Sequence, residues 1–332
     1  MTDPRIADLA ASARTGRLSR RDVLAAGLKL GLATPVIVGL MAAAPEVGAA
    51  PKPASRFPRP ADESNGTTFV YLRDGGSPDI DPHYAYENAA QAIILGAYEM
   101  LIQYKGDNTD QFEPMLAESW TASDDKSTYT FKLYPNVKFH DGDPCTAKSV
   151  YDSFTRFLLQ NAGPVNVLKR FMPDVAMMKV VDDLTISFSL GRPQPLFLPA
   201  MAASYGPFVI NTKYVDQNKT TADPYAHEWF RQNANGTGPY MVTENAPTEQ
   251  VVLKKFDGFH GGWDGNHFDT IVCRIVQEVA TRRQLVETGS ADATTQNLTP
   301  DDVDVMCANT DLQVLTYPAT AVFWAIMNAV KR

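Results

Sequence analysis

The sequence predicts a mixed α/β fold, because strand-like and helix-like runs alternate along most of the chain. Tyr129, Phe131 and Leu133 alternate with polar residues, which is the period of a half-buried strand. A helix is predicted soon afterwards, where Thr146 can serve as its N-cap. The apolar stripe of this helix consists of Val150, Tyr151, Phe154, Phe157 and Leu158. Both periods within one stretch are typical of an α/β unit.

The remaining elements follow the same two periods. Further helices are predicted at 88–104, 193–201, 281–288 and from Thr299 onwards. Further strands are predicted at 67–73, 137–139, 175–181, 184–190, 240–243, 250–256, 268–276 and 312–317. The turn Asp124-Asp125-Lys126 separates two strand-like runs, and we expect Trp120 and Tyr129 in the core of that hairpin.

Composition describes a globular protein with an acidic body. The 332 residues could form two domains of ordinary size, and 44% of them are hydrophobic while 20% are charged. The net charge is −8, and residues 1–49 carry six basic and four acidic residues, which leaves −8 − 2 = −10 for the remainder. An acidic body argues against nucleic acid or an anionic membrane as the partner.

Residues 1–49 are predicted to be an export signal. The run S-R-R-D-V-L, which contains Arg20 and Arg21, resembles the twin-arginine motif. The weakly apolar segment 23–44 that follows is interrupted by a lysine and a proline, which argues against a permanent membrane-spanning helix. Small residues at 47–49 provide a cleavage site, and an uncleaved membrane anchor is the alternative. We expect residues 50–66, rich in proline and charge, to form a flexible tether.

The loop after the first strand reads G-G-S-P-D-I-D-P-H and is the first candidate for a functional site. The pair Gly75 and Gly76 allows a ligand to approach the backbone N–H groups closely. An ordinary turn at the exit of a strand explains the same residues equally well. Asp79 and Asp81 raise the question of calcium, but the spacing of an EF-hand does not follow.

The sequence contains no catalytic motif, and we therefore expect no enzyme activity, no metal and no cofactor. G-x-S-x-G, H-E-x-x-H, the P-loop and G-x-G-x-x-G are all missing. His260 and His267 lie near each other in the sequence, but packing within a loop is favoured over metal binding. Cys145, Cys273 and Cys307 make no disulfide framework, although one bridge with one free thiol stays open.

Several ordered motifs resemble the family 5 extracytoplasmic solute-binding proteins, the peptide- and oligopeptide-binding components of ABC importers. The longest is 114–157, which contains P-M-L-A-E-S-W, a D-D turn, T-Y-T-F-K-L and N-V-K-F-H-D-G-D-P. The G-S-P loop with its D-P-H element and the run G-T-G-P-Y at 236–240 are further matches. Lys126 stands in place of the family's turn glycine, and Ser149 in place of an acidic residue at the start of the helix.

The resemblance implies a periplasmic-binding-protein-like (type II) α/β fold with a mixed sheet. Residues 67–79 and 193–328 would form the first lobe, and residues 80–192 an inserted subsidiary α/β domain. The strand at 323–328 resembles the crossing into a C-terminal lobe, and we expect that lobe to be absent because the chain stops at Arg332. We therefore expect a truncated chain that does not work alone as a receptor.

The resemblance also implies the function and the site. The protein would capture a solute in the periplasm, a peptide or else an oligosaccharide or another small molecule, and deliver it to the permease subunits of an ABC transporter. In the family the G-S-P loop lines the ligand cleft, which assigns Gly75, Gly76, Ser77 and Asp79 to ligand binding. A single-lobe interaction or structural protein is the alternative, followed by a secreted hydrolase.

Overall fold

The computed structural model describes residues 68–315 except residues 107, 109, 265–266 and 295–297. The predicted signal (1–49), tether (50–66) and hinge-crossing strand (323–328) lie outside the described residues. Within the described part, no helix is long and apolar enough to cross a membrane.

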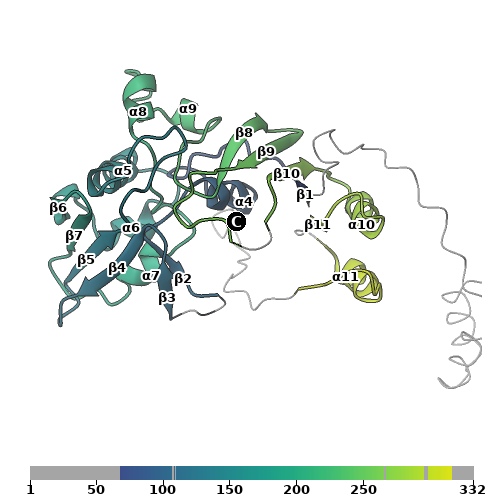
Figure 1. Cartoon of the computed structure of the whole chain (residues 1–332), viewed down its shortest axis with the longest axis horizontal. Helices are drawn as coiled ribbons and strands as arrows, with labels where there is room; N and C mark the ends of the chain where they lie inside the picture. Colours follow the sequence, from purple (N-terminus) through teal and green to yellow (C-terminus); the bar gives the residue numbers. More distant parts are fainter. Residues whose placement is uncertain (1–67, 107, 109, 265–266, 295–297, 316–332) are drawn as a thin grey trace, which may run out of the picture. The chain divides into compact units, whose positions relative to one another are not determined.

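Five strands form a mixed sheet in the order β11-β1-β10-β9-β8 (Figure 1). β1 is parallel to both of its neighbours, β10 and β11, whereas β9 is antiparallel to β10 and to β8. The strands are β1 (Thr68–Arg73), β8 (Tyr240–Ala246), β9 (Gln250–Lys255), β10 (Thr270–Ile275) and β11 (Ala293–Thr294). The mixed sheet implied by the resemblance is thus confirmed.

A second sheet has four antiparallel strands in the order β4-β5-β7-β6. They are β4 (Ala117–Ala122), β5 (Thr128–Leu133), β6 (Met178–Asp182) and β7 (Thr185–Ser189), so both predicted hairpins are confirmed. β5 buries Tyr129, Phe131 and Leu133 on one face, as the alternation predicts. A separate two-stranded hairpin joins β2 (Ile102–Tyr104) to β3 (Phe112–Pro114).

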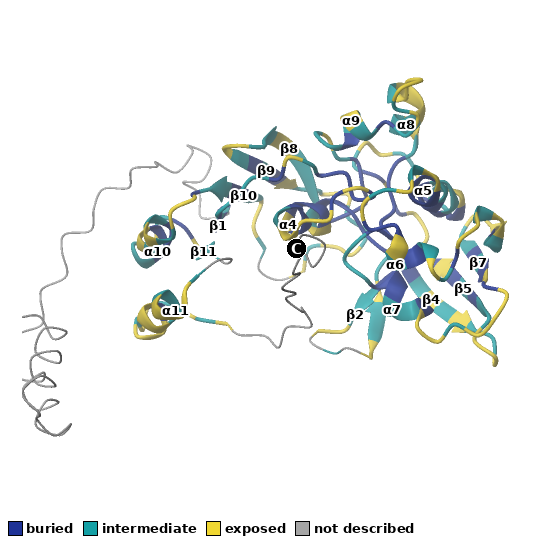
Figure 2. Cartoon of the chain, turned by 180° about the vertical axis from the view of Figure 1, so that it is seen from behind, coloured by how far each residue is buried: buried dark blue, intermediate teal, exposed yellow. Residues whose placement is uncertain are grey.

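Helices cover the two larger sheets. The helices of the described residues are α4 (Asn88–Ala97), α5 (Ala147–Gln160), α6 (Asn166–Lys169), α7 (Phe197–Met201), α8 (Lys213–Asn218), α9 (His227–Phe230), α10 (Val279–Glu287) and α11 (Pro300–Cys307), with a 3-10 turn η2 (Val175–Met177). On the five-stranded sheet, Ile93 of α4 packs on the face that carries Cys273, while Leu72 and Met306 belong to the apolar cluster on the other face. On the four-stranded sheet, Phe154 of α5 lies 5.9 Å from Phe188 of β7, ring centre to ring centre. Figure 2 shows the buried segments of α5 and β5 in dark blue.

The start of α5 shows how a family departure is accommodated. Ser149 Oγ accepts a hydrogen bond from the Thr146 N–H at 3.1 Å, so serine supplies the contact that an acidic residue makes in a capping box. Lys126 has φ = +57° and Asn136 has φ = +63°, both in the left-handed region. The turn at Lys126 therefore keeps its left-handed geometry without glycine.

The helix predicted at 88–104 is too long, because α4 ends at Ala97. Tyr98 is extended, Glu99 forms an isolated bridge with Val209, and the chain then enters β2. Met100 and Leu101 remain buried in the connection between α4 and β2, so apolar spacing alone does not distinguish a helix from a buried segment that is not helical.

The turn at 236–238 packs closely against the end of α4. A Cβ on Gly236 would lie 2.1 Å from the Ala97 carbonyl oxygen, and one on Gly238 would lie 2.6 Å from that of Gly96. The Gly238 N–H also donates to the Ala97 oxygen at 3.1 Å. These close contacts explain why both positions are glycine. A structural role for the turn is therefore favoured over contact with a ligand.

Candidate functional site

The candidate loop follows β1 and begins at the carboxyl ends of the three parallel strands β1, β10 and β11 of the five-stranded sheet. β1, β10 and β11 run in the same direction, so the segments that follow them emerge together. The turn between β8 and β9 lies at the same edge, since the Ile275 N–H donates to the Glu249 oxygen at 2.9 Å. In open α/β sheets, ligands bind outside the carboxyl ends of the strands. The loop at 74–79 is therefore at the edge where such a fold places its site.

The predicted site residues differ in how much room they leave. A Cβ on Gly75 would meet no atom within 4 Å, whereas one on Gly76 would lie 1.9 Å from the Pro247 carbonyl oxygen. Ser77 is buried, and its Oγ accepts a hydrogen bond from Arg73 Nη2 at 2.6 Å. Gly75 thus has open space beside its backbone, while Gly76 and Ser77 hold the loop against the sheet.

Asp79, the fourth predicted residue, is partly buried and already has partners. Its Oδ1 accepts from the Asp81 N–H at 2.9 Å, and its Oδ2 lies 3.2 Å from His227 Nε2. Burial raises the pKa of the Asp79 carboxyl despite these contacts. Asp79 also borders a cavity of about 290 Å³ that is lined on its other sides by Tyr84, Ala85, Tyr86, Glu87 and Gly163.

Behind this loop lies a buried ion pair that the sequence did not indicate. Asp81 is fully buried and binds Arg156 of α5 through two hydrogen bonds, of 2.9 Å from Nη1 and 2.6 Å from Nη2. Arg156 Nε donates to the Tyr225 oxygen at 2.9 Å, and its guanidinium carbon lies 4.5 Å from the centre of the Phe230 ring. Burial alone raises the pKa of the Asp81 carboxyl, but the Arg156 guanidinium outweighs it and holds that pKa well below its usual range.

Two histidines complete the cluster. His83 is buried, with Nε2 2.9 Å from the Phe208 oxygen and Nδ1 3.0 Å from Arg156 Nη1. Because Arg156 only donates, His83 Nδ1 is the acceptor and Nε2 carries the proton. His227 Nδ1 lies 3.1 Å from Asp81 Oδ2, and this hydrogen bond raises the pKa of His227. The cluster ties the candidate loop to α5 and α9.

The described residues contain neither a side-chain cluster that could hold a metal ion nor a disulfide. No set of three or more His, Cys, Asp or Glu side chains within them is placed to hold a metal ion. His260 instead hydrogen-bonds the buried Glu99 at 2.9 Å, as expected for a histidine packed within a loop. Cys145 and Cys273 are buried, Cys307 is exposed, and all three are free thiols.

Stability should fall as the pH drops from about 6.5 to 4, because His83 and His140 are held neutral. Burial, together with the Arg156 charge at His83, lowers each pKa from 6.5 to about 4. In that interval the unfolded chain binds protons that the folded chain does not, so the free energy of unfolding rises with pH. His227 has a raised pKa and therefore acts in the opposite direction. Its contribution to the free energy of unfolding is present below pH 6.5 and is lost as the pH rises through the pKa of the folded state.

Urea unfolding at pH 7 and pH 5 measures this dependence. The His140→Gln variant, which cannot titrate there, should lose less free energy of unfolding between the two values than the unaltered chain does. Equal losses in both proteins would contradict the assignment of His140.

Comparison with known proteins supports the resemblance to the family 5 solute-binding proteins. The family model described as bacterial extracellular solute-binding proteins, family 5 (middle part) matches residues 111–331. The probable D,D-dipeptide-binding periplasmic protein DdpA of Escherichia coli (strain K12) is 30% identical over 255 residues, which cover 76% of this chain and 47% of that protein. Haem-binding protein A of Haemophilus influenzae is 29% identical over 271 residues, covering 76% and 48%.

Solved structures agree on the fold. The periplasmic binding protein DppA of Helicobacter pylori, in complex with the peptide STSA, superposes with a TM-score of 0.62 at 23% identity and covers 73% of this chain and 49% of that one. The fold is therefore periplasmic-binding-protein-like, of type II. The chain spans about half the length of the relatives it matches.

Proposed function

Because this chain belongs to the family 5 bacterial extracellular solute-binding proteins, we propose that it captures a peptide-like solute outside the cytoplasm and delivers it to the permease of an ABC transporter. Two similar proteins support a peptide as the solute: one is named as a D,D-dipeptide-binding protein, and another was solved with a bound peptide. A haem-binding relative of similar identity makes another small solute the second candidate.

The single observation that carries the site is the open space at Gly75. A Cβ there meets no atom within 4 Å, at the edge where β1, β10 and β11 end. A peptide presents one donor and one acceptor per residue, and a site must replace the hydrogen bonds that these groups lose with water. Exposed backbone beside a glycine supplies such partners at close range. Gly76, Ser77 and Asp79 shape the loop around it.

Binding is proposed to involve closure of two lobes around the solute, which is a hinge motion. The proposed first lobe consists of residues 67–79 and 193–328, and the proposed subsidiary domain of residues 80–192. The four-stranded sheet and α5 fall within 80–192, which supports this division. The buried pair of Asp81 and Arg156 would then fix the start of the subsidiary domain.

The protein is proposed to work in the periplasm as a soluble, exported chain. The predicted twin-arginine signal at Arg20 and Arg21 supports this location, as do two similar proteins that are named as periplasmic. The permease subunits are the proposed partner, because the similar DppA structure is that of an ABC transporter-associated binding protein.

Native mass spectrometry of the exported full chain tests both parts of the proposal. The full-length gene is expressed in a bacterium with a twin-arginine pathway, and the protein is isolated from the extracytoplasmic fraction. We expect an adduct with the mass of a short peptide, which is released when the protein is unfolded. The variant with Arg20→Lys and Arg21→Lys should stay in the cytoplasm as a precursor. Normal export of that variant contradicts the signal, and an adduct that proves to be a sugar or a metal complex contradicts the peptide.

A further inference from the structure

A cavity of about 580 Å³ lies at the opposite edge of the five-stranded sheet from the candidate loop. The Lys255 N–H at the end of β9 donates to the Asp269 oxygen just before β10, so the loop after β9 emerges where β1 and β10 begin. The cavity is lined by Leu95, Glu99, Gln103, Pro114, Met115, Tyr134, Pro239, Phe259, His260 and Gly261. No residue of the candidate loop is part of this lining.

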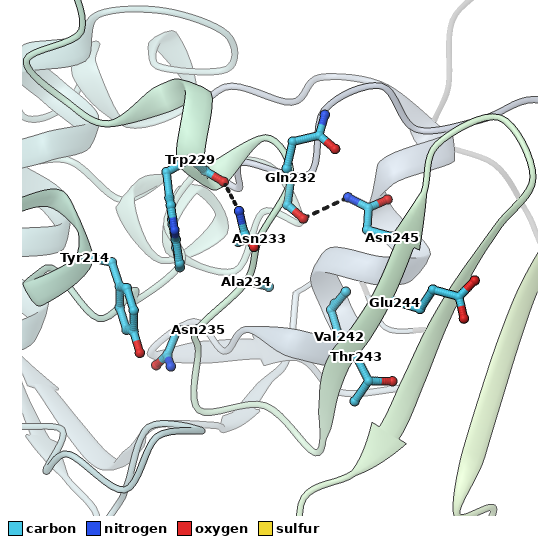
Figure 3. Close-up of a pocket in the computed structure, with 10 residues that line it drawn as sticks. All are labelled: Tyr214, Trp229, Gln232, Asn233, Ala234, Asn235, Val242, Thr243, Glu244 and Asn245. Atoms are coloured by element: carbon cyan, nitrogen blue, oxygen red, sulfur yellow. Dashed lines mark hydrogen bonds between the residues drawn. The ribbon is translucent and has the colours of Figure 1, made fainter. Parts of the chain in front are cut away.

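A smaller cavity, of about 170 Å³ between the α9 segment and β8, is less suited to a ligand (Figure 3). Asn233 Nδ2 and Asn245 Nδ2 donate to the Trp229 and Gln232 carbonyl oxygens, both at 3.0 Å, so two of its side-chain amides are already bonded within the wall. Ligand pockets typically have volumes of about 300–1,000 Å³, a range that the larger cavity reaches and the smaller one does not.

A buried carboxylate and a histidine form the polar end of the larger cavity. The Glu99 side chain is only 2% exposed, and His260 Nε2 lies 2.9 Å from its Oε1 and 3.2 Å from its Oε2. Because a carboxylate only accepts, Nε2 is the ring nitrogen that carries the proton. The other nitrogen, Nδ1, is neither buried nor bonded to any described residue. His260 therefore offers Nδ1 to an occupant of the cavity.

The chemistry of Nδ1 limits which group can pair with it. Nδ1 accepts a hydrogen bond when His260 is neutral and donates one when His260 is protonated. A hydroxyl both donates and accepts, so it can pair with either form. An ammonium group has no acceptor and would pair with the neutral form alone. A carboxylate would pair with the protonated form alone, and its charge would lie close to that of Glu99.

The other walls of the cavity are mostly apolar, and two of them are aromatic. The centres of the Tyr134 and Phe259 rings lie 5.3 Å and 5.1 Å from the centre of the His260 ring. Leu95 on α4 is 38% exposed and leaves one side of the cavity open to solvent. Aromatic rings pack favourably with their centres about 4.5–7 Å apart, so a flat ring can pack beside Tyr134 and Phe259.

We propose that this cavity binds a small, uncharged aromatic alcohol of the phenol class, whose hydroxyl pairs with His260 Nδ1 and whose ring packs against the apolar walls. Glu99 acts through His260, which it holds in place. The Tyr134 hydroxyl and Gln103 Oε1 bond no described residue and are further partners for a hydroxyl, whereas Gln103 Nε2 donates to Glu113 Oε1 at 2.7 Å. This binding goes beyond the proposed function and needs no residue of the candidate loop.

Titration of the full chain with 4-ethylphenol, followed by ¹⁵N NMR of the imidazole nitrogens, tests the proposal. We expect a saturable shift of the His260 Nδ1 signal, which is identified by its loss in His260→Gln. 4-Ethyltoluene has a methyl group in place of the hydroxyl and should bind about fivefold more weakly, because it cannot pair with Nδ1. Equal affinity for the two compounds, or no saturable shift with 4-ethylphenol, would overturn the proposal.

Leu95→Trp tests the location of the site, because the larger side chain fills the cavity from its open side. It should weaken binding of 4-ethylphenol about tenfold, since a filled cavity cannot enclose the ligand. Leu159→Trp is the matched control: Leu159 is an exposed leucine near the end of α5 and does not line the cavity. It should change the dissociation constant less than about twofold, as expected for an independent site. Unaltered affinity in Leu95→Trp would overturn the location.

The double variant with Glu99→Gln and His260→Phe tests the role of Nδ1. It removes the ring nitrogen without leaving an unpaired charge in the core, which His260→Phe alone would do. We expect this variant to bind 4-ethylphenol and 4-ethyltoluene with equal affinity. A preference for 4-ethylphenol as large as that of the unaltered chain would overturn the assignment of His260.

Discussion

Replacing Arg156 by methionine is expected to lower the free energy of unfolding by about 3–5 kcal/mol, because it leaves the Asp81 carboxylate charged and buried without its partner. Both side chains are almost fully buried, and the pair is joined by two hydrogen bonds. The change also removes the donors to the Tyr225 oxygen and to His83. Denaturant unfolding measures the loss.

Lys148→Met on the same helix is the matched control. Lys148 pairs with Asp152 one turn away, but its side chain is 73% exposed, and an exposed pair of this kind contributes less than about 1 kcal/mol. The double variant with Asp81→Asn and Arg156→Met should be less destabilised than the sum of the two single variants, because no unpaired charge remains. Similar losses in the free energy of unfolding for Lys148→Met and Arg156→Met would contradict a larger contribution of the buried pair.

Tyr129→Ala is the second large effect, and we expect a loss of about 3–5 kcal/mol. Tyr129 is 1% exposed, its ring centre lies 5.0 Å from that of Phe197, and its hydroxyl donates to the Gln194 oxygen at 3.0 Å. Truncation therefore opens a cavity in the core and also leaves an acceptor unpaired.

Trp120→Ala in the adjacent strand gives the comparison. Trp120 is only partly buried, although its ring still packs beside Phe131 at 6.5 Å. We expect a smaller loss than for Tyr129→Ala, because less apolar surface leaves contact with the core. A larger loss for Trp120→Ala would contradict the lower burial of Trp120.

The sequence predicts the local elements well where the period of apolar residues is unambiguous. The alternation through Tyr129, Phe131 and Leu133 correctly predicts both the strand and its buried face. Trp120 lies on the expected core face, opposite Phe131, but it is only partly buried because β4 is an outer strand of the four-stranded sheet. The same reasoning is wrong about the end of α4, because apolar residues at Met100 and Leu101 suit a buried segment that is not helical as well as a helix.

The buried cluster could not be predicted because its members are far apart in the sequence. Asp81 and Arg156 are 75 residues apart, and only the fold brings them together. The helix pattern gives no local signal either, because Arg156 lies beside Ser153 and outside the apolar stripe of α5 that carries Phe154 and Phe157. Similarly, the glycines at Gly75 and Gly76 look alike in the sequence, and only the neighbouring Pro247 separates the open position from the packed one.

The most direct test of solute capture at Gly75 is equilibrium dialysis of the full chain against a casein digest, with and without Gly75→Val. The added side chain meets no atom of the protein within 4 Å of its Cβ, so the melting temperature should stay unchanged. We expect the unaltered chain to retain peptides and the variant to retain at least tenfold less, a difference of about 1.4 kcal/mol in binding. Equal retention by both proteins, or no retained peptide in either, would contradict solute capture at this edge of the sheet.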